Sequence, residues 1–219
     1  AEVCRHVAEG AYQGHHALVV GGSRGLGELA AKAVLAGGGA VTLTYARGKE
    51  DALRICREAQ ALARTCSAEQ LDIDQLLTAA PPWLSGGFTH VYYFASPHIG
   101  KTAGTHWDSA LFGRFARVYV DAFAALVQLT AARPAGKPVV RYFYPSSVYV
   151  SGVEKGFAEY ASAKAAGELL CDALAQSLGV SIAKSRLPRM RTDQTSGLMD
   201  TGAIDALPAV LDFVRHLHE

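Results

Sequence analysis

Short apolar runs alternate with amphipathic runs along the chain. The short runs are rich in β-branched or aromatic residues and are bounded by glycine, proline or polar residues, which is typical of buried strands. We predict strands at 17–20, 40–45, 90–95, 139–144 and 180–185, and a strand end at 71–74. In the longer runs, apolar residues recur every three or four positions, which predicts helices. We predict helices at 25–36, 51–64, 108–132, 157–178 and 207–217, with short helices at 2–12 and from residue 75.

This alternation predicts the fold class. Strands that alternate with helices form parallel sheets, because each helix carries the chain back to the start of the next strand. No internal repeat or low-complexity linker interrupts the pattern. We therefore expect an α/β fold, with a single Rossmann-like doubly wound parallel sheet and helices on both faces.

Length and composition fit one domain. The 219 residues are half apolar, which is enough for a full core. We expect residues 1–219 to form a single domain, with a lead-in at 1–15 and a short substrate-side loop at 188–203. The chain opens with Ala1 rather than Met, which fits either a trimmed chain or a domain excised from a larger protein.

Charge and hydropathy exclude several classes of partner. The 21 Lys and Arg residues nearly balance the 20 Asp and Glu residues, so there is no electrostatic reason to bind nucleic acid or an anionic membrane. No apolar run is long enough to span a bilayer, and no secretory signal is visible. We expect a cytoplasmic protein that binds neither nucleic acid nor membrane.

The cysteines and histidines predict no metal site. The cysteines are Cys4, Cys56, Cys66 and Cys171. They lack C-x-x-C spacing, which favours reduced and idle thiols over disulfides or zinc ligands. The eight histidines also lack metal-ligand spacing. We interpret His15 and His16 as a polar lead-in to the first strand.

A glycine-rich turn joins the first strand to the first helix. Its spacing, Gly21-x-x-x-Gly25-x-Gly27, differs from the G-x-G-x-x-G of the general dinucleotide fingerprint. Glycine permits backbone torsions that a Cβ would obstruct, and it lets the main chain approach a pyrophosphate at a helix N-terminus. Glycines at such a turn can also be purely structural. The candidate phosphate-binding residues are Gly21, Ser23, Arg24, Gly25, Leu26 and Gly27.

Charge around the second strand favours NADPH over NADH. An acidic residue after this strand would bind the ribose 2′-hydroxyl, whereas an arginine accommodates a 2′-phosphate. No acid stands at positions 44–46, and Arg47 follows directly. Arg24 in the glycine-rich turn is a second cation near the same place. The alternative is that Arg47 is a solvated residue at the start of a helix.

Three residues carry the candidate chemistry. Tyr160 and Lys164 are four positions apart on a predicted helix, hence on one face. A nearby ammonium lowers the pKa of a phenol, which is about 10 in water. Ser147 lies thirteen residues before Tyr160, at the carboxyl end of a predicted strand, where open α/β sheets bind ligands. Ser146 is the alternative to Ser147, because adjacent strand residues face opposite ways.

Together with the glycine-rich turn, this set resembles the short-chain dehydrogenase/reductase family over most of the chain, from Gly21 to Lys164. The resemblance implies an NADP-dependent oxidoreductase in which Tyr160 gives a proton to a ketone oxygen as hydride arrives from NADPH. It implies that Ser147 hydrogen-bonds that oxygen. Lys164 would orient the nicotinamide ribose and lower the pKa of Tyr160.

The same resemblance implies further contacts. Asp72 and Ile73 resemble the family's acidic-apolar pair beside the adenine ring, although Asp74 has an alternative role as the N-cap of a short helix. The remaining implied cofactor contacts are Ala95, Tyr160, Lys164 and Pro188. In the family, the long helix predicted at 108–132 packs at a dimer interface, which implies a homo-oligomer.

The sequence departs from the family in three places. The family's Asn-Asn-Ala-Gly run corresponds to Tyr93-Phe94-Ala95-Ser96, so only Ala95 is kept. Tyr119 stands where many relatives carry an asparagine that relays protons to the lysine through water. Either its hydroxyl takes that role or its side chain belongs to the core. The usual Pro-Gly after the sixth strand is Pro188-Arg189, and the shorter chain beyond it predicts a reduced lid over the substrate.

These observations favour an NADPH-dependent ketoreductase, either free-standing or part of a larger biosynthetic enzyme. We expect a β-keto acyl or cyclic ketone substrate in a pocket lined by residues 96–107, 148–157 and 189–199. One alternative is an epimerase or dehydratase of the extended branch of the superfamily, which the glycine spacing and the short C-terminal part oppose. The other is a non-catalytic NADP-binding or assembly domain, which the intact serine, tyrosine and lysine oppose.

Overall fold

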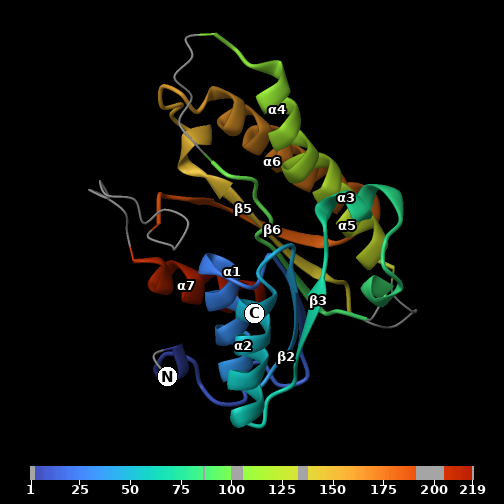
Figure 1. The fold of residues 1–219 in the computed structure, drawn as a ribbon, viewed down its shortest axis with the longest axis vertical. Coiled ribbons are helices and arrows are strands. Elements are labelled where there is room, and N and C mark those ends of the chain that lie inside the picture. Colours follow the sequence, from blue (N-terminus) through green and yellow to red (C-terminus); the bar gives the residue numbers. More distant parts are fainter. Residues whose placement is uncertain (1–2, 86, 100–105, 133–137, 191–204, 219) are drawn as a thin grey trace.

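A six-stranded parallel sheet forms the centre of the molecule (Figure 1). The computed structural model describes residues 3–85, 87–99, 106–132, 138–190 and 205–218. The strands are β1 (His16–Val20), β2 (Ala40–Tyr45), β3 (Cys66–Gln70), β4 (His90–Tyr93), β5 (Arg141–Ser147) and β6 (Ser181–Leu187). Their order is β3-β2-β1-β4-β5-β6, and all neighbours pair in parallel. This confirms the predicted doubly wound sheet.

Helices cover both faces of the sheet, with α1, α2 and α7 on one face and α3 to α6 on the other (Figure 1). The helices are α1 (Gly25–Ala36), α2 (Lys49–Ala61), α3 (Ile73–Thr78), α4 (Ser109–Ala116), α5 (Phe123–Thr130), α6 (Ala158–Leu178) and α7 (Ala206–His218). Short 3-10 turns lie at Val3–Arg5, Pro82–Ser85 and Val148–Val150. Within the described ranges, none of the helices has the length and apolar character needed to cross a membrane.

Alternate residues of β1 face the two helical layers. Ala17 and Val19 pack with side chains of α1, α2 and α7, whereas Leu18 and Val20 pack with those of α4, α5 and α6. All four are at most 1% exposed. Since full burial of a valine or leucine side chain contributes about 1.5–3 kcal/mol, β1 holds both layers together.

The third strand lies earlier than the sequence predicts. β3 ends at Gln70, and the run Leu71–Asp74 predicted as a strand end instead leads into α3. Asp72 accepts a hydrogen bond from the N–H of Asp74, and the Gln75 side chain accepts one from the N–H of Asp72. This reciprocal pair is a capping box. The N-cap is therefore Asp72 rather than Asp74. The helix predicted at 2–12 is also shorter, because only Val3–Arg5 forms a helical turn there.

The helix predicted at 108–132 is interrupted by a wider turn. A π-helical turn, Arg117–Ala122, separates α4 from α5. Two tyrosine hydroxyls donate to its carbonyls, Tyr93 to Val118 at 2.7 Å and Tyr144 to Tyr119 at 3.2 Å. These side chains supply donors to the irregular backbone that the turn creates. The helix facing Tyr144 carries Gly167 at the contact, where a Cβ would overlap the Tyr144 hydroxyl.

The four cysteines are free thiols in the structure, and two of them are neighbours. Sγ of Cys56 on α2 lies 3.2 Å from Sγ of Cys66 on β3. Burial raises the pKa of Cys66 well above its ordinary value and that of Cys171 to about 12. Both thiols are therefore protonated near neutral pH, which makes them weak nucleophiles.

His15 and His16 are not simply a polar lead-in. His16 is the first residue of β1, and its Nε2 lies 3.0 Å from Oγ1 of Thr42 on the neighbouring strand. The ring of His15 packs against the ring of His90, in the middle of the sequence, and against that of His218, near its C-terminal end. The prediction was wrong because the contacts depend on strand order, which the local pattern does not show.

Candidate active site

The predicted site residues gather at the edge of the sheet where the strands end. The glycine-rich turn follows β1, Ala95 lies two residues beyond β4, and Ser147 is the last residue of β5. Strand order reverses between β1 and β4, and open α/β sheets bind ligands at such a point. Arg47, Asp72 and Pro188 follow β2, β3 and β6 at the same edge. The arrangement suits an extended ligand that lies across the strand ends.

Close packing explains the glycines of the turn after β1. Gly21 adopts a φ of +75°, and a Cβ there would lie 3.0 Å from the backbone of Phe94. A Cβ on Gly27 would overlap the carbonyl oxygen of Gly21. Arg24, the N-cap of α1, makes no side-chain hydrogen bond to the first helical turn. The uncapped N–H groups at this helix end suit a phosphate, so the turn fits a dinucleotide.

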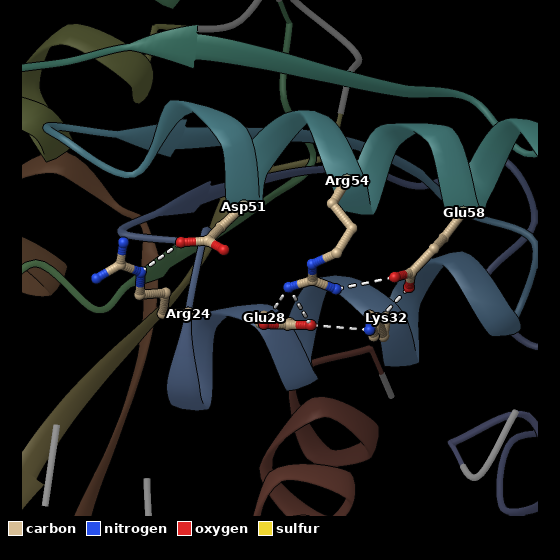
Figure 2. A network of polar contacts seen from close by, with 6 residues as sticks. All are labelled: Arg24, Glu28, Lys32, Asp51, Arg54 and Glu58. Atoms are coloured by element: carbon tan, nitrogen blue, oxygen red, sulfur yellow. Dashed lines mark hydrogen bonds and ion pairs between the residues drawn. The ribbon is translucent and has the colours of Figure 1, made fainter. Parts of the chain in front are cut away.

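Arg24 is paired with an acidic residue that the sequence analysis missed. Its Nε lies 2.6 Å from Oδ2 of Asp51, in the first turn of α2 (Figure 2). Both side chains are partly exposed, so the pair adds little stability. It does place a negative charge beside one of the two arginines expected to meet a 2′-phosphate. The available signal was an acid four positions after Arg47, at the start of a predicted helix.

The loop after β2 is held against the glycine-rich turn. A Cβ on Gly48 would lie 2.9 Å from Oγ of Ser23 and 3.5 Å from Nε of Arg24. Arg47 is exposed and directly precedes Gly48, so the two arginines share this edge. Further along, ion pairs shown in Figure 2 link Glu28 and Lys32 of α1 to Arg54 and Glu58 of α2. These contacts fix α2 relative to the turn.

The two serines at the end of β5 have different partners. Oγ of Ser146 donates to Oε1 of Glu168 at 2.5 Å, and Glu168 also accepts two hydrogen bonds from Arg186. Ser147 points to the other side of the strand, where its Oγ accepts from the N–H of Tyr149 and lies close enough to Tyr160 to lower the pKa of that phenol. The structure thus brings Ser147, rather than Ser146, to Tyr160.

Tyr160 lies in the first turn of α6, among aromatic rings. The rings of Phe115, Tyr119 and Tyr149 meet it edge-on, with centres 5.5, 5.8 and 6.2 Å away. Burial raises the pKa of Tyr160 above its ordinary value, a hydrogen bond with Ser147 lowers it, and Tyr149 raises it further. The phenol therefore keeps its proton near neutral pH, which is the form that an acid needs.

The expected lowering of the Tyr160 pKa by Lys164 is not found. Nζ of Lys164 lies 6.0 Å from the centre of the Tyr160 ring and donates to the carbonyl of Pro145 at 2.6 Å. It sits 3.7 Å from the centre of the Tyr119 ring and 5.1 Å from that of Tyr144. Burial lowers the pKa of Lys164 itself to about 7. The described contacts of its ammonium group are therefore ring faces and one carbonyl, which compensate its charge.

Tyr119 is a core residue with a polar edge. It is 1% exposed, and its hydroxyl lies 2.7 Å from Oγ of Ser96. Its ring face, rather than its hydroxyl, meets Lys164, and its carbonyl accepts from Tyr144. The core interpretation fits this geometry better than a direct hydroxyl replacement of the asparagine. The contact of the ring with Lys164 was not predicted, because it depends on the π-helical turn.

Part of the expected substrate pocket lies outside the described residues. The short loop at 188–203 and the lining segments 96–107 and 189–199 are described only in part, up to Met190 and apart from 100–105. Pro188 directly follows β6. On the described side, the rings of Tyr149 and Phe157 stack with centres 4.8 Å apart. This aromatic pair lies next to Tyr160 and suits an apolar substrate group.

Comparison with known proteins relates the chain to solved structures. No protein-family model and no curated protein matches it. A short chain dehydrogenase from Burkholderia cenocepacia, solved in complex with NADP, is 25% identical with a TM-score of 0.80, covering 95% of this chain and 91% of its own. A double mutant of a Serratia marcescens short-chain dehydrogenase/reductase is 23% identical, with a TM-score of 0.79 and the same coverage. RhlG of Pseudomonas aeruginosa, in a complex with NADP, is 20% identical, with a TM-score of 0.77 and coverage of 94% and 90%.

The buried ammonium of Lys164 predicts a pH-dependent stability difference. Its pKa falls from 10.5 in the unfolded chain to about 7 in the folded protein. Below pH 7 both states hold the proton, and the folded state bears the full cost of the buried charge. Between pH 7 and 10.5 the unfolded chain binds more protons, so stability rises with pH. Lys164→Met should therefore stabilise the protein by about 1–4 kcal/mol at pH 6, with the difference shrinking toward pH 10.

Urea unfolding at a series of pH values measures this difference. Lys155→Met, at an exposed lysine, is the matched control and should show no pH-dependent difference from the wild type. A Lys164→Met protein that is less stable at every pH, or a difference that does not change with pH, would contradict the prediction.

Proposed function

We propose that this chain is an NADPH-dependent ketoreductase of the short-chain dehydrogenase/reductase type, with Tyr160 as its general acid. The observation that carries the proposal is the gathering of Ser147, Tyr160 and Lys164 at the same edge of the sheet as the glycine-rich turn. The printed descriptions of several structural neighbours name NADP or NADPH, which supports the cofactor.

The chain's own residues fit a dinucleotide. The main chain of the glycine-rich turn and the first turn of α1 would hold the pyrophosphate. Arg24 and Arg47 would meet the 2′-phosphate, and Asp72 and Ile73 would lie beside the adenine. The nicotinamide half would lie near Ala95, Pro188, Tyr160 and Lys164. When bound, NADPH supplies the hydride.

Each catalytic residue has a separate task in this proposal. The Ser147 hydroxyl donates a hydrogen bond to the substrate carbonyl oxygen and orients it toward Tyr160. Tyr160 transfers its proton to that oxygen as negative charge develops there. Lys164, fixed by the Pro145 carbonyl and the Tyr119 ring, orients the ribose hydroxyls. The raised pKa of Tyr160 keeps its proton in place until the oxygen becomes strongly basic.

A β-keto acyl or cyclic ketone is the proposed substrate class. The stacked rings of Tyr149 and Phe157, beside Tyr160, support a flat or apolar group next to the carbonyl. We also keep the proposals of a single domain, a cytoplasmic location and a homo-oligomer through the long helices. Leu169 on α6, 74% exposed, is consistent with such a contact.

Removal of the Tyr160 hydroxyl tests the mechanism. Tyr160→Phe should lower kcat at least tenfold, a barrier increase of ~1.4 kcal/mol or more, and leave NADPH affinity nearly unchanged, because only the proton donor is lost. Lys164→Ala should weaken both cofactor binding and turnover. NADPH oxidation with β-keto thioesters and bicyclic ketones provides the assay. Tyr12→Phe, on the opposite edge of the sheet, is the control. A Tyr160→Phe rate above about a tenth of the wild type would exclude Tyr160 as the acid.

Cofactor preference tests the two arginines. We expect NADPH to bind at least tenfold more tightly than NADH, roughly 1.4 kcal/mol, and this preference to disappear in Arg24→Ala with Arg47→Ala. Asp51→Asn should strengthen NADPH binding, because it frees Arg24 and removes a negative charge near the 2′-phosphate. Nucleotide fluorescence titration measures each affinity. Arg57→Ala, an exposed arginine of α2, controls for net charge. Equal affinities in the wild type would refute the assignment.

Substitutions at Tyr119 separate its ring from its hydroxyl. Tyr119→Phe keeps the ring under Lys164 and loses only the hydrogen bond to Ser96, so turnover and its pH profile should change little. The cost in stability should be about 1 kcal/mol. Tyr119→Leu removes the ring face and should lower turnover and cofactor affinity together. A stable Tyr119→Phe protein with a clear loss of turnover would instead give the hydroxyl a role in proton transfer.

A further inference from the structure

Three histidines from distant parts of the sequence meet at the edge of the sheet opposite the candidate active site. His15 directly precedes β1, His90 begins β4, and His218 ends α7. One ring nitrogen from each histidine lies within 4.8 Å of those of the other two, and Nδ1 of His15 lies 2.5 Å from Nδ1 of His218. The parallel register that pairs Ala17 with His90 brings the first two together.

Buried polar atoms without partners concentrate at this place. In the described part of the protein, three buried side-chain atoms lack a hydrogen bond of normal geometry: Nε2 of His90, Nε2 of His218 and the hydroxyl oxygen of Tyr92. The Tyr92 ring centre lies 6.2 Å from that of His218. Leaving a buried polar atom unpaired costs about 1–3 kcal/mol, so such atoms usually indicate an ion or a water molecule. Two of the three atoms belong to the histidine cluster, which indicates a ligand there.

The surroundings of His90 orient it as a metal ligand. The Thr89 hydroxyl donates to the carbonyl of His16 at 3.1 Å and lies 2.8 Å from Nδ1 of His90. Since that hydroxyl proton is already used, Nδ1 carries the hydrogen and donates it to Thr89. Nε2 then presents a lone pair, and it is buried with no donor. A second-shell oxygen that fixes the tautomer in this way is typical of metal-binding histidines.

We propose that His15, His90 and His218 bind one divalent transition-metal ion of the class that imidazole prefers, with Zn²⁺ as the natural candidate. Bonds of 2.0–2.1 Å in a tetrahedral site require nitrogens about 3.3–3.5 Å apart. The contact of His15 with His218 must therefore open by about 1 Å, and the stacked ring of His218 must turn. His15 is half-buried and borders a surface hollow with Gly38 and Gly39, which leaves solvent for the fourth position.

The role of the ion would be structural. It would tie the last turn of α7 to the starts of β1 and β4, on the edge of the sheet remote from Ser147 and Tyr160. The proposal is therefore independent of the proposed reductase activity. Arg141, whose guanidinium donates to the Leu217 carbonyl at 3.0 Å, places a positive charge nearby that weakens the site.

Metal titration of the untagged, EDTA-treated chain tests the proposal. Addition of Co²⁺ should give visible absorption typical of tetrahedral nitrogen coordination, saturating at one ion per chain, and Zn²⁺ should displace it and raise Tm. His15→Gln and His218→Gln, at half-buried positions, should each weaken affinity at least about tenfold. His216→Gln, an exposed histidine of the same helix, should leave affinity unchanged.

Two further measurements test the metal site even where a histidine variant fails to fold. X-ray absorption of the Zn²⁺-loaded wild type should show three imidazole ligands, and Arg141→Gln should bind Co²⁺ more tightly. Absence of saturable Co²⁺ absorption in the wild type, fewer than three imidazoles on Zn²⁺, or affinity unchanged by both His15→Gln and His218→Gln would overturn the proposal.

Discussion

The parallel pairing of β1 with both β2 and β4 is the constraint on which the rest of the structure depends. From β1 the chain winds outward through β2 and β3 on one side and through β4, β5 and β6 on the other. The loops after β1 and β4 therefore lead away from each other at the adjacent carboxyl ends of these two strands. Gly21 lies against the backbone of Phe94 there, with no room for a side chain. The same pairing sets His15 beside His90 at the other edge.

In the candidate site, the ammonium group of Lys164 is buried, and its described contacts include no carboxylate. The described contacts of Lys164 are the carbonyl of Pro145 and the faces of tyrosine rings. A ring face attracts a cation without adding a formal negative charge. A carboxylate in the same place would raise the pKa of Lys164 and add its own cost of burial. The aromatic surroundings keep the lysine close to its titration point and leave the neighbouring tyrosine protonated.

Local patterns predicted those parts of the fold that local forces determine. The glycines around α1 and the apolar rows of β1 and β2 fixed those elements within one residue. β3 was not predicted at its observed position, because its sequence, Cys66–Gln70, is mostly polar and its side chains are only partly buried at the sheet edge. The serine, tyrosine and lysine could be found from spacing on one strand and one helix. The pairing of Arg24 with Asp51 and the histidine cluster could not, because each joins separate elements.

Two tyrosines that lie far apart in the sequence meet at one backbone feature of the fold. Tyr93 is the last residue of β4, and Tyr119 lies in the π-helical turn between α4 and α5. In the fold, the Tyr93 hydroxyl binds the carbonyl of Val118, next to Tyr119 in the same π-helical turn. The two positions are therefore linked through the backbone of the turn. Loss of the Tyr93 hydroxyl would leave the Val118 carbonyl without this donor, and the effect would reach the turn that holds the Tyr119 ring under Lys164.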